Sequence, residues 1–560
     1  MRSARGAGPD VSVRMVEIMA DKVLVCVAWP YANGSLHVGQ VAGAYLPADI
    51  FARFNRIIGN DVLMVSGSDE HGTPITVRAD QEHRAPKEIT DHFHEEFLKT
   101  WQDLGISFDL FTRTGTDNHR EVVHEIFLKL LSEGHITRDT MQALYCVNDR
   151  RYLPDRYVEG KCPHCGFEGA RGDQCDNCGR PLDGIDLIDP RCRFCGQRPE
   201  VRETEHFFFQ LPHFEATLRD WAREQTHWRP AVRNATVSFL ESGLQPRPIT
   251  RDIEWGVPVP LPGYEDKRIY VWFEACIGYL SATIEWAKSQ GNPEGWKEWW
   301  TGPARSYYFI GKDNTFFHTI IWPAELLGEG GLNLPSDVPA NEYLTLENAK
   351  VSTSRNWAIW VPEFLQRYDP DPLRYMLAAN MPESRDADFT WEEFVRRNND
   401  ELVATWGNLV NRVLTFAVRN FDGGVPDAGD EVTLLVEARA AETFATVAEL
   451  LGGCHFKDAL REVMALAQYG NRLLDERAPW RQIREDRAAT GDTVLGILNL
   501  INGLKVLTYP FLPFTAERLH HMLGYEDDLI SHGWRLERLI PGAKLGEPAP
   551  LFTKLEVEAK

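Results

Sequence analysis

The chain has 560 residues, enough for several domains that each bury a core. Its hydrophobic content of 43% and charged content of 25% are ordinary for a globular protein. No apolar run reaches the roughly 18 residues that cross a bilayer. The net charge of −22 argues against a protein that coats nucleic acid without specificity, but it leaves room for one shaped basic patch. Residues 1–20 lack the apolar stretch of a signal peptide, so we expect a tail on a cytoplasmic protein.

An apolar run at residues 23–28 precedes a turn rich in proline, asparagine, glycine and serine. The run predicts a buried strand, and residues 41–58 are long and apolar enough for a helix. Such a strand, turn and helix form the phosphate-facing corner of a doubly wound α/β fold, because the helix N-terminus offers unpaired N–H groups and a positive dipole end. Within the turn, His37 adds a donor and Gly39 allows close approach of a nucleotide.

Residues 30–40, PYANGSLHVGQ, resemble the HIGH signature of class I aminoacyl-tRNA synthetases, and the flanks are similar to the methionyl-tRNA synthetase family. The resemblance extends over about residues 21–525. It implies an α/β fold with a Rossmann-like doubly wound parallel sheet, an inserted connective domain with zinc knuckles, and a C-terminal α-helical anticodon-binding bundle. Gln40 stands where the family has a second histidine. Glutamine still donates an N–H but cannot carry a positive charge.

The resemblance also divides the chain. An N-terminal tail at 1–20 precedes the first catalytic half at 21–140, the connective insertion at 141–240 and the second catalytic half at 241–335. A stem-contact region with a KMSKS-like loop follows at 336–390, then the helical anticodon-binding domain at 391–530 and a tail at 531–560. The insertion is too short to hold a hydrolytic editing domain beside its knuckles. No dimerisation domain follows residue 530, so we expect a monomer.

A second strand is predicted at residues 60–66, and it leads to Asp69 and His71. Side chains at the carboxyl end of a parallel strand lie where open α/β sheets bind ligands. The resemblance implies that Asp69 holds the α-amino group of the substrate. The alternative is that Asp69 and His71 only cap the next helix. Helical patterns follow at residues 87–104 and 120–133.

Six of the ten cysteines form Cys-x-x-Cys pairs, a spacing that favours metal over disulfides in a chain without a secretory signal. Two of these pairs form knuckles that suit a structural, tetrahedral zinc ion with Zn–S distances of about 2.3 Å. Their ligands are Cys162, Cys165, Cys175 and Cys178. The third pair leaves two interpretations open: a second site with one oxygen ligand, or a decayed site that holds no metal. The second site would consist of Cys146, Asp149, Cys192 and Cys195.

The second catalytic half is rich in aromatic residues. Residues 270–275 predict a strand, residues 307–313 predict a strand and turn, and residues 316–318 open a helix. Aromatic residues at such spacing belong more often to a core than to a ligand site. The resemblance reverses that expectation, because it implies a methionine pocket lined by Tyr31, Trp272, Ala275, Tyr279, Phe317 and His318. Aromatic rings suit the polarizable thioether of methionine. Cys276 replaces a proline found in a bacterial relative, so the detailed pocket shape stays open.

Residues 350–356, KVSTSRN, look like the KMSKS loop, whose lysines stabilise charge on the transferring phosphate. Lys350 keeps the first lysine, Thr353 replaces the second, and Arg355 is near enough in sequence to offer a substitute cation. One donor aimed at developing charge is worth roughly 10²–10³ in rate. The resemblance therefore implies catalytic roles for His37, Gln40, Lys350 and Arg355, and ATP contacts for Gly39, Asp313, Lys350 and Thr353. We expect less positive side-chain charge around the triphosphate than is usual in the family.

From residue 391 the pattern is helical. Asn408 and Arg412 are four residues apart on one helix face, and such groups suit the reading of unstacked RNA bases. Trp480 matches a family position where tryptophan stacks on an anticodon base; the alternative is a hydrophobic plug. Two apolar stripes predict the core of the bundle. The first contains Leu434, Leu435, Ala438, Ala441, Phe444, Val447 and Leu451, and the second contains Phe456, Leu460, Val463 and Leu466.

Together, these features predict an enzyme that activates L-methionine with ATP and transfers it to initiator and elongator tRNA(Met). Mg²⁺ would accompany ATP, and Zn²⁺ would be structural. Two alternatives are a methionine-activating paralogue with altered or lost tRNA charging, and a non-catalytic decayed synthetase that binds RNA or protein. Thr353 motivates the first, as does Ala404, which replaces an asparagine of bacterial relatives.

Overall fold

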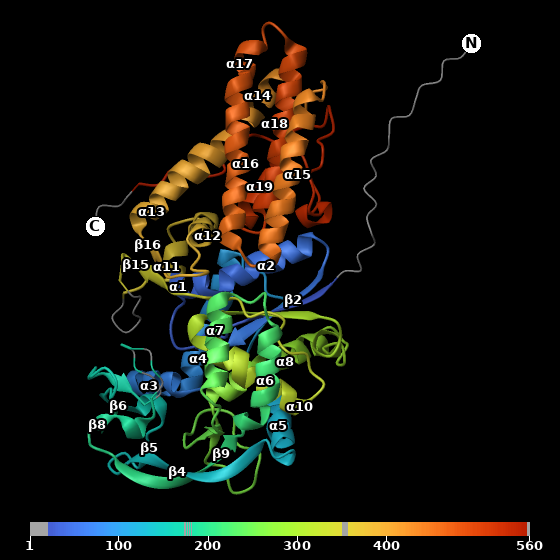
Figure 1. Cartoon of the computed structure of the whole chain (residues 1–560). Coiled ribbons are helices and arrows are strands. Elements are labelled where there is room, and N and C mark those ends of the chain that lie inside the picture. Colours follow the sequence, from blue (N-terminus) through green and yellow to red (C-terminus); the bar gives the residue numbers. More distant parts are fainter. Residues whose placement is uncertain are drawn as a thin grey trace.

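A five-stranded parallel sheet forms the centre of the catalytic half (Figure 1). The computed structural model describes residues 21–172, 175, 177–178, 180, 182–349 and 357–556. The sheet has the order β14-β13-β1-β2-β3, and its strands are β1 (Lys22–Val27), β2 (Asp61–Ser68), β3 (Leu110–Arg113), β13 (Arg305–Gly311) and β14 (Ala340–Asn341). β1 pairs in parallel with both β2 and β13. The strand order reverses at β1, so the predicted doubly wound sheet is confirmed.

Helices cover both faces of this sheet. Val23, Val25 and Val27 of β1 belong to one buried core, whereas Leu24 and Cys26 belong to another. Because successive side chains of a strand point to opposite faces, the apolar run of β1 serves two helical layers. The first layer contains α2 (Leu46–Ile57) and α4 (Pro86–Leu104), and the second contains α5 (Asp117–Ser132), α8 (Val271–Ser289) and α10 (Trp322–Glu329).

The chain between β3 and β13 contains an inserted unit. β4 (Ile136–Cys146) and β9 (Glu200–Phe209) form a long antiparallel pair, to which β5 (Arg151–Tyr152) and β10 (Arg247–Pro248) add. This ribbon leads to a small sheet of β6 (Val158–Lys161), β7 (Ala170–Arg171) and β8 (Ile188–Cys192) (Figure 1). Cys162 follows β6 directly, and Cys192 ends β8. Two helices, α6 (Glu215–Glu224) and α7 (Pro230–Glu241), return the chain to the body.

A helical bundle stands on the catalytic half (Figure 1). The connection contains β15 (Leu344–Leu346) and β16 (Ala387–Phe389), which pair in parallel, and the helices α11 (Val361–Leu365), α12 (Pro370–Ala379) and α13 (Trp391–Arg396). A π-helical segment, Arg397–Gly407, continues α13 into α14 (Asn408–Asn420). The remaining helices are α15 (Glu431–Gly452), α16 (Phe456–Arg477), α17 (Pro479–Gln482), α18 (Arg487–Thr508) and α19 (Pro513–Met522). The predicted C-terminal bundle is therefore confirmed.

The strand predicted at residues 270–275 is wrong, because Val271 begins the 19-residue helix α8. The segment is rich in aromatic and β-branched residues, which locally favour a strand. A short apolar run cannot distinguish a buried strand from a buried helix. The helix prevails because its continuation packs on α5 and β2.

The first predicted stripe of the bundle is also partly wrong. Leu434 and Leu435 of α15 are 53% and 47% exposed, and Ala438 and Ala441 are exposed as well. The buried face instead begins at Val432 and continues through Val436, Ala440, Phe444, Val447 and Leu451. Because leucines lie on both the buried and the exposed sides of α15, the sequence pattern did not indicate which side faces the core. All four residues of the second stripe are buried.

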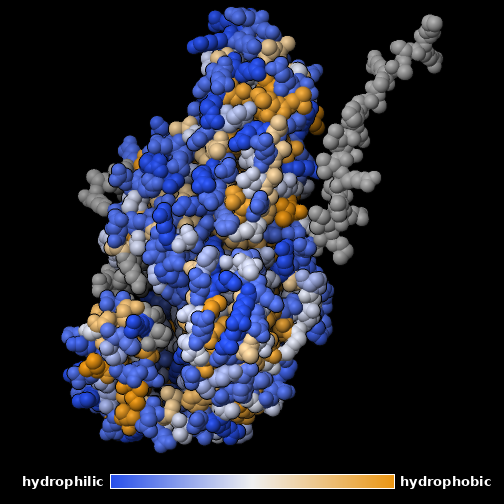
Figure 2. Space-filling model, in the orientation of Figure 1, coloured by the Kyte–Doolittle hydropathy of each residue, from blue (hydrophilic) through white to orange (hydrophobic). Residues whose placement is uncertain are grey.

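The described helices include none that is long and apolar enough to span a membrane. The face of the molecule shown in Figure 2 is largely hydrophilic, with small hydrophobic patches.

Candidate active site

The predicted signature forms a tight helix start at the carboxyl end of β1. His37 is the N-cap of α1 (Val38–Gln40), and its Nδ1 accepts hydrogen bonds from the N–H groups of Gly39 at 3.1 Å and Gln40 at 3.3 Å. The Gln40 Oε1 in turn accepts from the N–H of His37 at 3.0 Å. This reciprocal capping box holds the start of α1 in place. The helix then continues through a π-helical turn, Val41–Tyr45, into α2.

The capping geometry also determines the chemistry of His37. Since its Nδ1 accepts hydrogen bonds, the ring proton lies on Nε2, which can donate to an anion. Burial lowers the pKa of His37 to about 4, so the imidazole is neutral at pH 7. The Gln40 carboxamide oxygen is used by the cap, and its NH₂ group can still donate. Both side chains are therefore neutral donors beside a helix N-terminus.

Backbone pairing brings three parts of the predicted site together. The N–H of Ala32 donates to the Asp69 carbonyl at 2.8 Å, so Tyr31 and Asp69 are neighbours. On the other side, the N–H of Val38 donates to the Ile359 carbonyl at 3.0 Å. A Cβ at Gly39 would lie 3.0 Å from the His37 ring and 3.6 Å from the carbonyl oxygen of Leu344. Lys350, Thr353 and Arg355 lie outside the described residues.

Asp69 lies just after β2 and is only 3% exposed. Its Oδ1 accepts from the N–H of His71 at 3.2 Å, while the His71 ring donates to Glu274 of α8 at 2.7 Å. Burial raises the pKa of Asp69 well above its usual range, and the nearby Glu274 carboxylate adds to the effect. A cationic ligand would stabilise the ionised form. The following helix, α3 (Thr73–Glu82), has Gly72 as its N-cap and no side-chain cap, so the helix-capping alternative is wrong.

The aromatic residues of the predicted methionine pocket lie together near Asp69, which pairs through its backbone with Tyr31. The rings of Trp272 and Phe317 stack with centroids 4.5 Å apart, and Tyr31 meets Trp272 edge to face at 6.0 Å. Trp272 lies on α8, and Phe317 begins the π-helical turn Phe317–Ile321. Ala275 is three residues after Trp272 and therefore shares its helix face. These three rings are each partly exposed, as expected for groups at the mouth of a site.

Two further residues of the predicted pocket, Tyr279 and His318, form a buried polar pair. The His318 Nδ1 donates to the Asn314 carbonyl at 2.9 Å, so its Nε2 accepts from the Tyr279 hydroxyl at 2.8 Å. Burial lowers the pKa of His318 to about 4, which keeps the ring neutral. The hydrogen bonds therefore determine the orientation of both rings without adding charge to the pocket.

Sequence reasoning missed Trp29, which follows β1 and lies against this pocket. Its indole fits between Gly67 and Gly278: a Cβ at either glycine would approach a ring atom to 2.2 Å or 2.8 Å. The ring also meets Tyr279 edge to face at 6.4 Å. The available signal was the pair of glycines inside a strand and a helix, where glycine often marks close approach of another group.

Asp313 lies at the carboxyl end of β13, across the switch point from His37. Its Oδ1 accepts a hydrogen bond from the Tyr343 hydroxyl. The neighbouring Lys312 pairs with Glu342 at 2.6 Å and with Asp386 at 3.0 Å. Asp313 is exposed, so it can accept further hydrogen bonds from a ligand.

The cysteine knuckles bring their ligand atoms together. Cys162 and Cys178 have sulfur atoms 4.0 Å apart, and those of Cys165 and Cys175 are 3.6 Å apart. A tetrahedral zinc site with bonds of about 2.3 Å requires sulfur separations of about 3.8 Å. The four cysteines therefore fit a zinc ion.

The second predicted ligand set is also assembled. The Cys146 sulfur lies 3.4 Å from that of Cys195, and an Asp149 oxygen lies 3.3 Å from Cys146 and 3.0 Å from Cys192. All four ligand atoms lie within 4.8 Å of one another. This arrangement can hold a metal ion through three sulfurs and one oxygen.

Two predicted anticodon residues meet at the far end of the bundle. The Arg412 guanidinium lies over the Trp480 ring at 4.9 Å and pairs with Asp475 at 2.8 Å. Trp480 is 41% exposed. Asn408 is exposed one turn earlier on α14.

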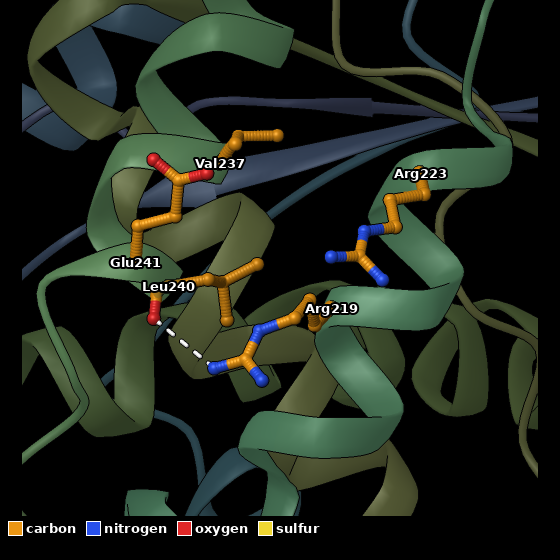
Figure 3. A pocket seen from close by; sticks show the side chains of 5 residues that line it. All are labelled: Arg219, Arg223, Val237, Leu240 and Glu241. Carbon is orange, nitrogen blue, oxygen red and sulfur yellow. Dashed lines mark hydrogen bonds between the residues drawn. The ribbon is translucent and has the colours of Figure 1, made fainter.

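A hollow of about 320 Å³ lies between α6 and α7, away from these groups (Figure 3). Arg219 and Arg223 approach it from α6, and Val237, Leu240 and Glu241 from α7. Both arginines already pair with carboxylates of their own helix, Glu215 and Asp220. The hollow contains none of the predicted site residues.

The family models agree with this arrangement. A model described as class I (M) tRNA synthetases matches residues 23–414, and a model described as the anticodon binding domain of methionyl tRNA ligase matches residues 425–560. The chain belongs to the methionine–tRNA ligase family. The family and the class I synthetase fold expected from the sequence are thereby confirmed.

Individual members of this family match along nearly the whole chain. The methionine–tRNA ligase of Thermomicrobium roseum is 56% identical, with 96% of this chain and 97% of that protein covered. That of Dehalococcoides mccartyi is 55% identical, with 96% and 98% covered. A solved structure of Mycobacterium tuberculosis methionyl-tRNA synthetase bound by methionyl-adenylate matches with a TM-score of 0.79 at 25% identity, covering 95% of this chain and 100% of that chain.

Proposed function

We propose that the protein activates L-methionine with ATP and transfers the methionyl group to initiator and elongator tRNA(Met). The observation that carries this proposal is the arrangement at the switch point: buried Asp69 pairs through its backbone with Tyr31, the Tyr31 ring meets the aromatic cluster at Trp272, and the loop after Tyr31 leads to the His37-capped helix start. A carboxylate, an apolar pocket and an anion-binding helix end match the ammonium, the thioether and the phosphates that must meet there.

Methionine would bind with its ammonium on Asp69 and its side chain among the aromatic rings. The rings of Tyr31, Trp272 and Phe317 would contact the thioether, since sulfur interacts favourably with aromatic faces and edges. Ala275 leaves space on α8, while the Tyr279–His318 hydrogen bond forms the polar back of the pocket. The Tyr279 hydroxyl and the His318 imidazole are both neutral at pH 7, which suits the uncharged side chain of methionine.

ATP would lie across the switch point. The Nε2–H of His37 and the NH₂ group of Gln40 would donate to phosphate oxygens, Gly39 would allow the phosphates to approach the positive end of the helix dipole, and Asp313 would accept from ribose hydroxyls. Lys350, Thr353 and Arg355 would contact the pyrophosphate side. Mg²⁺ bound with ATP would neutralise part of its phosphate charge. The protein contributes mainly positioning and electrostatic stabilisation.

The reaction would proceed in two steps. A methionine carboxylate oxygen attacks the α-phosphorus, the bond to the β-phosphate oxygen breaks, and pyrophosphate leaves. A hydroxyl of the terminal tRNA ribose then attacks the methionyl carbonyl, its proton is lost, and AMP leaves. Asn408, Arg412 and Trp480 would select the tRNA by contacting unstacked anticodon bases.

The decisive test is methionine-dependent exchange of pyrophosphate into ATP, measured with all twenty amino acids. We expect methionine alone to support rapid exchange, and we expect Asp69→Ala and Lys350→Ala to slow it. Preference for another amino acid would contradict the substrate assignment. Unchanged exchange in both variants would contradict the site assignment. Fractionation of cells and sedimentation of the enzyme would test the expected cytoplasmic monomer.

Each ligand set is proposed to hold one structural Zn²⁺, which would order its knuckles without entering the reaction. We therefore expect two zinc ions per chain by elemental analysis. Asp149→Ala should remove only the ion of the Cys146 set, and Cys178→Ser only that of the Cys162 set. A content of one zinc ion that Asp149→Ala leaves unchanged would show that the Cys146 set holds no metal.

A further inference from the structure

Two histidines and one aspartate meet where the chain turns back after α19. His520 lies near the C-terminal end of α19, Asp527 lies in the connection that follows, and His532 ends the 3₁₀-helix Leu529–His532. The Asp527 Oδ1 is 3.5 Å from the His520 Nε2 and 3.1 Å from the His532 Nε2. The proposed contacts to methionine, ATP, tRNA and the two zinc ions involve none of these three residues.

The spacing of these atoms fits a metal ion. Zinc held tetrahedrally by imidazole and carboxylate groups, with bonds of about 2.0–2.1 Å, requires ligand atoms about 3.3–3.4 Å apart. All three ligand atoms lie within 4.8 Å of one another. The His520 side chain is fully buried and that of His532 is 15% exposed, whereas that of Asp527 is 60% exposed. The protein therefore holds both imidazoles in place and leaves the carboxylate side open for an ion to enter.

The hydrogen bonds of His532 favour a cation beside its Nε2. Its Nδ1 donates to the Glu537 carboxylate at 2.6 Å, so in the neutral ring the Nε2 carries a lone pair. This lone pair faces both oxygens of the Asp527 carboxylate at 3.1 Å. Two acceptors repel each other unless a proton or a metal ion lies between them. A carboxylate on the other ring nitrogen is also the arrangement that metal-binding histidines commonly have.

The ring of His520 is also held in place. It stacks on Tyr525 with centroids 4.5 Å apart, and Tyr525 meets His532 edge to face at 4.8 Å. The His520 Nδ1 lies 2.9 Å from the Nζ of the buried Lys505, and its Nε2 lies 3.0 Å from the Asp527 carbonyl oxygen. A metal ion at this Nε2 would replace the ring proton there. Lys505 would pass one proton to Nδ1, and the proton of Nε2 would be released to solvent.

We propose that His520, Asp527 and His532 bind a divalent transition-metal ion, with Zn²⁺ as the expected occupant. Imidazole nitrogens suit zinc, and the carboxylate oxygen supplies negative charge. Because the set contains no thiolate, the ion should exchange more readily than those of the cysteine sets. Enzyme dialysed against metal-free buffer should therefore keep two zinc ions and leave this third site to be filled by added metal.

Such an ion would hold a segment that contacts both the bundle and the catalytic half. Trp534, two residues after His532, meets Phe54 of α2 edge to face at 5.1 Å. Its indole N–H donates to the Phe444 carbonyl of α15 at 3.2 Å. The metal would therefore crosslink α19 to a segment that packs between α2 and α15, which gives the ion a structural role.

The test measures uptake of metal by untagged enzyme whose cysteine sets are already filled with zinc. Calorimetric titration with Zn²⁺ should show one additional ion per chain, and that ion should raise the melting temperature. Asp527→Asn, a change at a largely exposed carboxylate, and His532→Asn should abolish both effects. Glu537→Gln should weaken binding by about 10- to 100-fold, because it removes the carboxylate that orients His532. His521→Asn, at the exposed neighbour of His520 on α19, is the matched control and should bind zinc as the wild type does.

Titration with Co²⁺ identifies the ligands of the added ion. A site of nitrogen and oxygen ligands should give visible ligand-field bands without the near-ultraviolet charge-transfer band of thiolate–cobalt bonds. Absence of a third ion in the wild type, wild-type uptake by both Asp527→Asn and His532→Asn, or a thiolate band that accounts for the added cobalt would overturn the proposal. The first result would leave His532 as an imidazolium between two carboxylates. None of these measurements depends on amino-acid activation, so failure of this proposal is distinguishable from failure of the proposed function.

Discussion

At the scale of single residues, Asp69 is the proposed binding group for the ammonium of methionine. Burial first, and the Glu274 carboxylate second, raise the pKa of Asp69. In the free enzyme, the folded state therefore binds this proton more tightly than the unfolded state does. The resulting stability is present at low pH and is lost as the pH rises through the folded pKa. Methionine should reverse this, because its ammonium favours the ionised carboxylate.

We therefore predict that methionine binding weakens on acidification, by up to tenfold per pH unit below the pKa of Asp69. His37 and His318 do not contribute above about pH 5, because both have a pKa of about 4. Asp69→Asn should bind methionine about 10- to 100-fold more weakly at pH 7.5, as expected for loss of a charged hydrogen bond. It should also lack the acidic decline. Calorimetric titration between pH 5.5 and 8 measures both effects, and an acidic decline that persists in Asp69→Asn would assign it to another group.

At the scale of elements, the fit of α8 against β2 determines where the Trp29 ring lies. A Cβ at Gly67 of β2 would meet Cζ3 and Cη2 of the indole, and a Cβ at Gly278 of α8 would meet Cε2 and Cζ2, so neither position has room for a Cβ. Tyr279, the residue after Gly278 on α8, belongs to the proposed methionine pocket, and its ring meets the indole edge to face at 6.4 Å. A shift of the indole would therefore reach the proposed pocket through Tyr279.

Gly278→Ala should displace this ring, because the added methyl group would lie 2.8 Å from two of its atoms. Overpacking of this kind costs about 1–3 kcal/mol, and we expect a lower melting temperature together with a higher KM for methionine. Gly452→Ala, at the last residue of α15 and with no atom within 4 Å of the added Cβ, provides a control for the exchange assay.

A second substitution shows whether the destabilisation by Gly278→Ala comes from a clash with the Trp29 ring or from the loss of the glycine itself. Trp29→Leu makes room for the methyl group, so Gly278→Ala should cost less in the Trp29→Leu background than alone. Thermal unfolding of the four proteins gives the coupling energy. Purely additive effects would show that the two residues do not crowd one another.

The sequence predicted an element correctly where its hydrophobic periodicity and its flanking residues indicate the same structure, as for β1, β2 and α4. It failed where one local pattern fits two structures, as in α8, whose aromatic start is equally compatible with a strand. The position of Asp69 after a predicted strand indicated a ligand site, but its role and the set of pocket residues came only from the family resemblance, since long-range pairing such as that of Ala32 with Asp69 has no local signal. Trp29 was missed because its position is defined by glycines far apart in the chain.

At the scale of the whole molecule, the catalytic half and the bundle share one continuous core, which includes Val25 of β1 and Leu500 of α18. A buried ion pair lies where these halves meet: Asp49 of α2 and Arg374 of α12, both fully buried, are 2.6 Å apart. Arg374 also donates to the Phe511 carbonyl at 2.8 Å, in the turn between α18 and α19. The helix that begins at His37 is thus tied to the base of the bundle.

Burial and the neighbouring arginines have opposite effects on the pKa of Asp49 at this junction. Burial alone would raise the pKa of Asp49, but Arg53 and Arg374 lower it to about 2. Because the folded pKa is lowered, the stability that Asp49 contributes is present above its ordinary pKa of 3.8 and is lost as the pH falls toward 2. The pair is therefore intact throughout the neutral range.

Arg374→Leu should destabilise the protein by about 3–5 kcal/mol, because it leaves the Asp49 carboxylate with less compensation in the interior. Urea unfolding measures the loss, and the exposed pair of Arg538 with Glu437 supplies a control, since Arg538→Gln should cost less than about 1 kcal/mol. In folded Arg374→Leu, tRNA charging should fall more than pyrophosphate exchange, because only charging requires the bundle to hold the tRNA in register with the active site. Equal loss of both activities would mean that the pair supports the catalytic half alone. Loss of neither would show that packing of the shared core is sufficient to orient the bundle.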